Sequence, residues 1–366
     1  MIAFIPLTGF LGAGKTTTAI SAALALQRTG RRVAVLTNDQ GVDLVDTNLV
    51  RSALGEAAEI SGGSFSSRFD ALGALLAHLA DGGRIDTVIA ESTGTGADLR
   101  ATVLRPLRRH YGDRIAVGPL TALVDPLRFA EFERTAGRGA SFTELSYLFD
   151  RQFAEADVLA LTKADLVGPE RAGKAAAELA ARHPHAELVQ YSATKSDGLA
   201  PLLAAWARRP APADRDVELD YARYAAAEAE LSWMNQALHV RAAAGEFDAS
   251  AWGHAVLRHL SGWCAQNSSL IGHAKLDVRT AAGMAKLSVT EAGAAPRLDR
   301  TAAGQVEQGA ATVNLRVACP PSALDAALCA AVSAADDACR ARTSAPMPVS
   351  FHPEHPAPRH RLTAGP

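Results

Sequence analysis

The chain reads Gly9-Phe10-Leu11-Gly12-Ala13-Gly14-Lys15-Thr16 near its start, and this stretch decides the fold of what surrounds it. It fits the pattern G-x-x-x-x-G-K-[ST] of phosphate-binding loops. The apolar run 2–7 precedes it and predicts a buried strand, while residues 16–27 carry apolar side chains at helical spacing. Strand, glycine loop and helix are the context that the pattern requires. The sequence therefore predicts a nucleoside triphosphate site, with a glycine turn that binds nothing as the alternative.

The residue types of this loop suit phosphate binding. Glycines let successive backbone N–H groups turn toward phosphate oxygens, and the following helix adds a favourable dipole at its N-terminus. We expect Lys15 to reach the β- and γ-phosphates and stabilise the transferring group, and the Thr16 hydroxyl to bind Mg²⁺. The predicted phosphate-contacting residues are Gly9, Gly12, Ala13, Gly14, Lys15, Thr16 and Thr17.

Composition narrows the class of protein. The 366 residues suggest two or three domains. A net charge of −2 offers no electrostatic reason to expect a nucleic-acid partner, and no apolar stretch approaches the roughly twenty residues of a membrane span. No C-x-x-C spacing links the four cysteines, which are Cys264, Cys319, Cys329 and Cys339. We therefore expect a cytoplasmic protein with neither a membrane nor a nucleic-acid partner.

Strand and helix patterns alternate through the first part of the chain. Further short apolar runs predict strands at 33–37, 86–90, 120–124, 158–161 and 187–191. Helical spacing occurs between these runs, and such alternation is typical of a parallel sheet covered by helices on both faces. The predicted fold class is α/β, with a P-loop nucleoside triphosphatase domain over residues 1–209.

The pattern changes after a linker rich in proline and alanine, which we place at 210–227. Several strand candidates then follow one another without intervening helices, which predicts a smaller α+β domain over 228–345. Prolines and histidines recur in 346–366, so this tail is predicted to lie extended over the surface.

Two short motifs bear on the identity of the base. Thr162-Lys163-Ala164-Asp165 directly follows the predicted strand 158–161 and resembles the guanine-specificity element N-K-x-D of GTPases. An aspartate there accepts hydrogen bonds from both N1–H and the exocyclic amine of guanine, which adenine does not offer. Ser192-Ala193-Thr194-Lys195 follows the next strand and resembles the S-A-K loop that contacts guanine O6. Thr162 replaces the usual asparagine, so a preference for ATP, as in an ATPase or a small-molecule kinase, stays open.

Acidic residues at strand ends are candidates for the hydrolytic chemistry. Glu91 ends the strand 86–90, where a carboxylate can hold Mg²⁺ through water or position the attacking water. Gly94 would let the backbone approach the γ-phosphate. Asp39, in a polar loop after the strand 33–37, could respond to the same phosphate. A helix cap is the alternative role for such an acid.

These motifs together resemble those of the CobW-like GTPases, which are grouped with UreG, HypB and MeaB. The resemblance rests on G-F-L-G-A-G-K-T-T at 9–17, E-x-x-G at 91–94, T-K-A-D at 162–165 and S-A-T-K at 192–195. It covers the first domain and extends less specifically to the second, which looks like the small CobW C-terminal domain. It implies a GTPase that delivers a metal ion, or that loads or reactivates a metal- or corrinoid-dependent enzyme. A nucleotide-dependent homodimer is common among such relatives.

One departure from this family pattern concerns the residues that would bind the delivered metal ion. The C-x-C-C motif usual in CobW-like proteins is replaced here by Ser64, Ser66 and Ser67. A serine hydroxyl stays protonated near neutral pH and binds soft transition metals poorly, whereas a thiolate binds them well. The sequence therefore predicts GTP and Mg²⁺ as ligands and argues against a transition metal at this loop.

The expected function is a slow GTPase whose nucleotide state controls docking to a client metalloenzyme or corrinoid protein. One alternative is a metallochaperone whose metal ligands are not cysteines or assemble only at an interface. The other is a nucleotide-gated scaffold with little hydrolysis.

Overall fold

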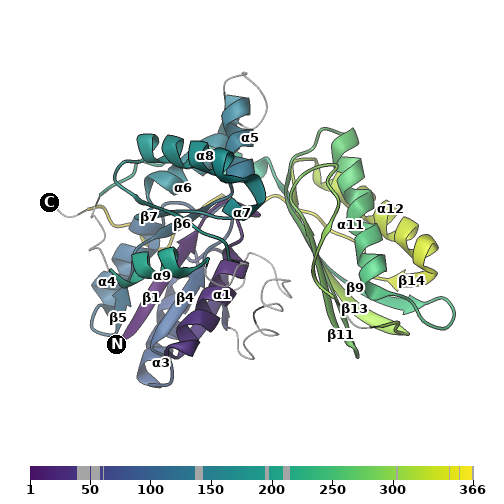
Figure 1. Cartoon of the computed structure of the whole chain (residues 1–366), viewed down its shortest axis with the longest axis horizontal. Coiled ribbons are helices and arrows are strands. Elements are labelled where there is room, and N and C mark those ends of the chain that lie inside the picture. Colours follow the sequence, from purple (N-terminus) through teal and green to yellow (C-terminus); the bar gives the residue numbers. More distant parts are fainter. Residues whose placement is uncertain are drawn as a thin grey trace. The chain divides into compact units, whose positions relative to one another are not determined.

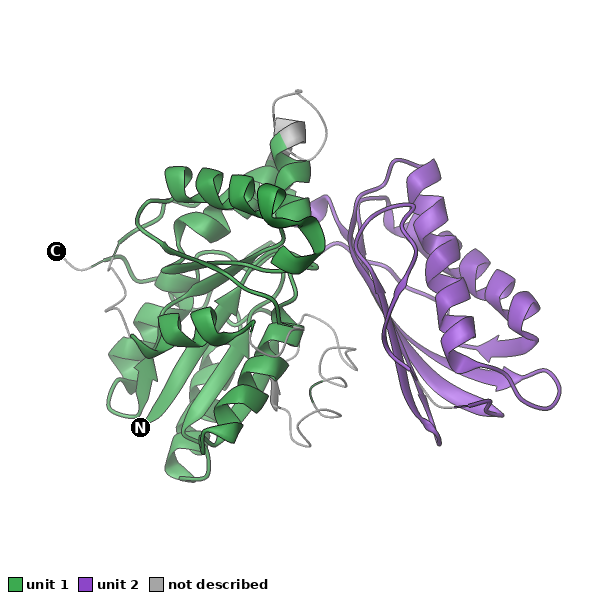
Figure 2. Ribbon diagram, in the orientation of Figure 1, with its two compact units in different colours: residues 1–41, 46–227, 355–366 green, residues 42–45, 228–354 purple. Residues whose placement is uncertain are grey.

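The computed structural model describes residues 1–38, 50, 58–60, 62–136, 143–193, 198–208, 215–301, 304–345, 347–353 and 355–364. These described residues form two compact units (Figure 2). The first unit takes the described residues up to Ala227 together with 355–364, and the second takes those from Glu228 to 353. Among the described residues, no helix has the length and apolarity needed to cross a bilayer.

The first unit is built on a sheet whose strand order is β3-β2-β4-β1-β6-β7-β8, with β5 also paired to β1 (Figure 1). Every neighbouring pair is parallel. Its strands are β1 (Ile2–Thr8), β2 (Val33–Asn38), β3 (Ala58–Ile60), β4 (Thr87–Glu91), β5 (Ile115–Val117), β6 (Thr121–Val124), β7 (Val158–Leu161) and β8 (Glu187–Gln190). Because the strands are parallel, the loops that follow their carboxyl ends meet at one edge of the sheet.

Helices cover both faces of this sheet. The described helices that begin in this unit are α1 (Lys15–Arg28), α3 (Phe69–Asp81), the π-helix η1 (Arg100–Leu104), α4 (Arg105–Tyr111), α5 (Pro126–Ala136), α6 (Thr143–Ala154), α7 (Ala164–Val167), α8 (Pro169–Arg182), α9 (Ala200–Ala207) and α10 (Tyr221–Ala229), whose last two residues belong to the second unit. Alternate residues of β1 enter two separate cores, because successive strand side chains point to opposite faces. Ile5 and Leu7 pack with residues of α1 and α9, and Ile2 and Phe4 pack with residues of α3, η1 and α4.

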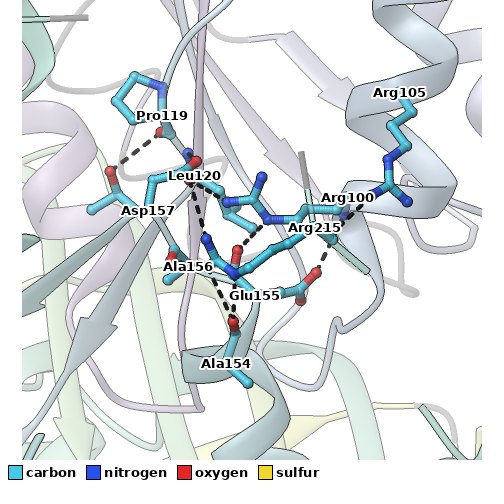
Figure 3. Close-up of polar contacts among 10 residues, drawn as sticks. Arg100, Arg105, Pro119, Leu120, Ala154, Glu155, Ala156, Asp157 and Arg215 are labelled. Carbon is cyan, nitrogen blue, oxygen red and sulfur yellow. Dashed lines mark hydrogen bonds and ion pairs between the residues drawn. The ribbon is translucent and has the colours of Figure 1, made fainter. Parts of the chain in front are cut away.

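A buried polar network holds the amino ends of β6 and β7 (Figure 3). Asp157, directly before β7, forms an ion pair with the Arg100 guanidinium and accepts a hydrogen bond from the Leu120 N–H at 2.9 Å. Arg100 Nε donates to the carbonyl of Glu155 at 2.6 Å, and Arg215 donates to neighbouring backbone carbonyls. Since Arg100 begins η1, the network fixes the end of the segment that follows β4.

The second unit is an antiparallel sheet of strand order β12-β11-β10-β13-β9-β14 with two helices (Figure 1). Its strands are β9 (Ser232–Ala242), β10 (Ile271–Thr280), β11 (Gly283–Val289), β12 (Arg297–Arg300), β13 (Gln308–Val317) and β14 (Ala341–Ser344). Helices α11 (Ala249–Gln266) and α12 (Pro321–Cys339) supply apolar side chains to one core with the sheet. The predicted fold class, a parallel α/β unit followed by a smaller α+β unit, is confirmed.

The described parts of the C-terminal tail belong to different units. Phe351 pairs with Trp233 of β9 in the second unit. Residues 355–364 belong to the first unit, where Arg361 Nε donates to Asp98 Oδ2 at 2.8 Å and the Leu362 N–H donates to the Ala101 carbonyl at 2.9 Å.

Candidate nucleotide-binding site

The glycine loop lies between β1 and α1, at the carboxyl edge of the parallel sheet. A Cβ on Gly9 would lie 2.4 Å from the Leu123 carbonyl oxygen of β6, so only glycine allows this close approach. Gly14 has φ +91° directly before α1, a left-handed conformation that a side chain would disfavour. The first turn of α1 therefore starts from a loop that is held close to the sheet.

Lys15 and Thr16 are buried at the start of α1, and their polar atoms turn toward the strand ends. Lys15 Nζ donates to the carbonyls of Gly9 at 2.7 Å and Phe10 at 3.3 Å. Thr16 Oγ1 donates to Glu91 Oε1 at 3.0 Å. The structure thus brings the predicted phosphate lysine, Mg²⁺ hydroxyl and strand-end carboxylate to one place, although Glu91 is 75 residues from Thr16.

The predicted base-recognition motif contacts the glycine loop directly. The Thr162 hydroxyl lies 3.0 Å from the Ala13 carbonyl oxygen and 3.2 Å from that of Val124. Lys163 Nζ donates to the Gly12 carbonyl at 2.8 Å and to Asp125 Oδ2 at 2.6 Å. The lysine thereby connects β6, β7 and the glycine loop through charge-assisted hydrogen bonds.

Other predicted base contacts lie nearby in the fold. Asp165 is exposed in the first turn of α7. Ser192 is buried two residues after the end of β8, and Ala193 follows it half-buried. β7 and β8 are adjacent and parallel, so the two motifs follow neighbouring strand ends.

The remaining predicted residues differ in what the structure describes of them. Gly94 is buried beside the glycine loop, and a Cβ there would lie 2.3 Å from Leu11 Cδ2. Thr17 is half-buried in the first turn of α1. Asp39 lies outside the described residues, as do Thr194 and Lys195.

Sequence reasoning assigned no role to two residues of this edge. Asp125 pairs with Lys163, and its position at the end of a predicted strand, before a proline, was an available signal. Gln152 of α6 donates to the carbonyls of Gly94 at 3.1 Å and Gly96 at 3.0 Å. No sequence pattern marks Gln152, because it sits within an ordinary amphipathic helix.

In the loop that carries Ser64, Ser66 and Ser67, which we call the serine loop, the hydroxyl groups form hydrogen bonds with one another. Ser64 Oγ lies 2.8 Å from Ser66 Oγ and donates to Ser67 Oγ at 3.3 Å. In the described part of the chain, no three His, Cys, Asp or Glu side chains gather in a way that could hold a metal ion. The donor chemistry of this loop does not fit a transition metal.

The fold and the site define the class of protein: a P-loop nucleotide-binding protein, with the phosphate loop at the carboxyl edge of a parallel sheet. The family profile described as CobW/HypB/UreG, nucleotide-binding domain, matches residues 3–190, and the chain belongs to this family. No curated protein sequence matches the chain.

Solved structures of several P-loop proteins are similar to this chain. Zn(II)-bound YjiA GTPase from E. coli is 20% identical, with 90% of this chain and 98% of that chain covered and a TM-score of 0.38. HypB from Helicobacter pylori in complex with nickel is 15% identical, with 54% of this chain and 82% of that chain covered and a TM-score of 0.37. The signal recognition particle receptor FtsY from Elizabethkingia anophelis in complex with GDP is 18% identical, with 52% of this chain and 57% of that chain covered and a TM-score of 0.36. At TM-scores this low, none of these likenesses defines what this chain binds.

Proposed function

We propose that this protein binds and hydrolyses GTP and acts as a maturation or reactivation factor for a metalloenzyme or a corrinoid protein. The observation that carries the nucleotide-binding part of the proposal is the contact of Thr162 and Lys163 with the backbone of the glycine loop. The maturation role is inferred from membership of the CobW/HypB/UreG family. These contacts join the base-recognition motif and the phosphate loop into one site. Asp165, exposed two residues after Lys163, supplies the carboxylate that distinguishes guanine from adenine.

The chain's own residues account for phosphoryl transfer to water. Phosphate oxygens would replace the Gly9 and Phe10 carbonyls as acceptors for Lys15 Nζ, since a charged acceptor makes the stronger hydrogen bond. Lys15 then offsets charge on the transferring group, and Glu91 orients the attacking water. No strong base is required, because this reaction depends mainly on positioning and charge neutralisation, so slow turnover without a client is expected.

The Thr16 hydroxyl and the Glu91 carboxylate fit Mg²⁺. Both supply oxygen ligands, the two oxygens lie 3.0 Å apart, and Thr16 belongs to the first turn of α1. When bound, Mg²⁺ would neutralise part of the charge on the phosphate oxygens. The serine loop offers no thiolate, so no step of the proposed function passes through a transition metal there.

Nucleotide state is proposed to control client docking, and a nucleotide-dependent homodimer is a further part of the proposal. The partner can be captured with protein held in its GTP form by a non-hydrolysable analogue. A metalloenzyme or corrinoid protein recovered with the analogue, but not with GDP, supports the proposal. Recovery that is independent of the nucleotide contradicts it.

Nucleotide binding itself is tested with two substitutions. Lys15→Ala removes the phosphate cation and is expected to abolish binding of both GTP and GDP. Asp165→Asn should weaken GTP binding while leaving the glycine loop intact, since the amide cannot accept both guanine hydrogens. Isothermal titration with GTP and ATP measures each effect, and GTP binding retained by Lys15→Ala, or a preference for ATP in the unaltered protein, refutes the assignment.

A further inference from the structure

The segment after Glu91 is packed directly against the glycine loop. All of its residues from Ser92 to Ala97 are buried. Gly94 lies so close to Leu11 of the glycine loop that an added Cβ would approach Leu11 Cδ2 to 2.3 Å and the Leu11 Cα to 3.2 Å. A shift of Gly94 toward Leu11 would therefore displace the glycine loop.

Gln152 holds this segment from the other side. Its side chain is fully buried, and its Nε2 donates to the Gly94 carbonyl at 3.1 Å and to the Gly96 carbonyl at 3.0 Å. Two carbonyl acceptors require that the NH₂ group, rather than the amide oxygen, faces the segment. Because peptide groups are planar and trans, fixing these two carbonyls also fixes the directions of the N–H groups that follow them.

The helix that carries Gln152 also supports the glycine loop. Phe149 lies three residues before Gln152, hence on the same face of α6, and its ring packs edge-on against Phe10 with centroids 5.7 Å apart. One face of α6 therefore contacts both segments that would surround the γ-phosphate.

The amide of Gln152 uses its donors but not its acceptor. Its Oε1 is buried and has no hydrogen-bond partner among the described residues. A buried polar atom without a partner is unfavourable. An apolar side chain of similar size would avoid this cost, but it would also take the donor away from the Gly94 and Gly96 carbonyls. The contribution of Gln152 therefore lies in its two donors, which act on the backbone of the 92–97 segment.

We infer that Gln152 is a positioning residue for GTP hydrolysis, which holds the backbone of Gly94 and Gly96 in the conformation that receives the γ-phosphate. The inference rests on the proposed GTPase function. Gln152 acts through the backbone, so its loss should affect the step that involves the γ-phosphate. Binding of GDP, which lacks this phosphate, should change little.

The test compares Gln152→Met, which keeps the length without donors, with Gln152→Asn, whose amide is one methylene too short to reach both carbonyls. Gln236→Met is the matched control, because Gln236 is also buried and donates to a backbone carbonyl, that of Ala237 at 3.0 Å in β9. Steady-state GTP turnover, GDP affinity, Tm and hydrogen exchange of the 92–97 amides are measured on the full chain.

We expect kcat to fall about 10- to 100-fold in both Gln152 variants, the size of effect that a misplaced group causes. GDP affinity should stay within about threefold, and exchange should quicken at 92–97 but not in α1. Gln236→Met should lower Tm without changing kcat. A kcat within about threefold of the unaltered protein in a folded Gln152 variant, or equal losses of GDP affinity and kcat, overturns the inference. Absence of GTP turnover in the unaltered protein overturns the proposed function first.

Discussion

Replacing Gly94 with alanine tests the close contact between the two loops of the site. The added Cβ would lie 2.3 Å from Leu11 Cδ2 and 2.7 Å from Leu11 Cγ. Carbon atoms in contact normally lie about 3.5–4.0 Å apart, so the Leu11 side chain must move by more than about 1 Å. Overpacking of this kind costs about 1–3 kcal/mol of stability. Because Leu11 belongs to the glycine loop, we also expect GTP turnover to fall about tenfold or more.

A double-mutant cycle identifies Leu11 as the cause. Leu11→Ala alone removes a buried side chain and should destabilise by about 2–5 kcal/mol. In the double variant the new Cβ occupies part of the vacated space. The double variant should therefore be destabilised by about 0.5–3 kcal/mol less than the sum of the two single variants. The relief is partial, since the Leu11 Cα stays 3.2 Å from the added carbon.

The assay is denaturant unfolding with and without GDP, because a shift on adding GDP identifies the transition of the nucleotide-binding unit. Gly173→Ala is the matched control: it lies in α8, nothing lies within 4 Å of its added Cβ, and it should stabilise by about 0.5–1 kcal/mol. Unchanged stability and turnover in Gly94→Ala, or additive costs in the cycle, would refute the packing argument.

Three other outcomes are expected. Burial, together with the charge of Asp98, raises the pKa of Glu155 from 4.5 to about 8. The folded state therefore keeps this proton where the unfolded state has lost it, and stability should fall as pH rises from about 4.5 to 8. Glu155→Gln should flatten that fall, by up to about 3 kcal/mol near pH 7; parallel pH profiles for the two proteins would contradict this. Arg361→Ala removes one of two donors that lie 2.8 Å from Asp98 Oδ2, the other being the Tyr221 hydroxyl, and takes the only charge-assisted one of the pair from a buried carboxylate. It should cost about 1–3 kcal/mol in the same unfolding assay, and a loss below about 0.5 kcal/mol would show the contact to be weak. Replacing Ser64, Ser66 and Ser67 with cysteine should create a Co²⁺ site with thiolate charge-transfer absorption. Equal absorption by the unaltered protein would contradict the claim that the serines bind transition metals poorly.

Local patterns in the sequence were sufficient to predict the fold class and the phosphate loop. Strand, glycine loop and helix are contiguous over residues 2–28, so spacing and residue type specify them without knowledge of the rest of the chain. The same holds for β2, β4, β6 and β7 of the first unit, whose apolar runs reflect burial on both faces. The family membership predicted from four motifs is confirmed by the match over residues 3–190.

Short elements could not be predicted in the same way. β3 and β5 have three residues each, which is too short to show a period. β12 and β14 are as long as β7, but they consist largely of polar residues, so no apolar run marks them. β12 is also exposed throughout, so no apolar alternation marks it. These strands exist because a neighbouring strand offers backbone hydrogen bonds, and that neighbour is known only once the sheet is assembled.

The sequence by itself determined that a phosphate loop precedes a strand-end glutamate and a T-K-A-D motif, because each is written in adjacent residues. Only the tertiary structure decided that Thr16 meets Glu91, that Lys163 meets Gly12 151 residues away, and that Gln152 holds Gly94. The physical reason is the strand order: β1 lies between β4 and β6, with β7 beyond β6, so these loops share one edge of the sheet. Contacts of this kind depend on which strands become neighbours, and spacing along the chain does not encode that.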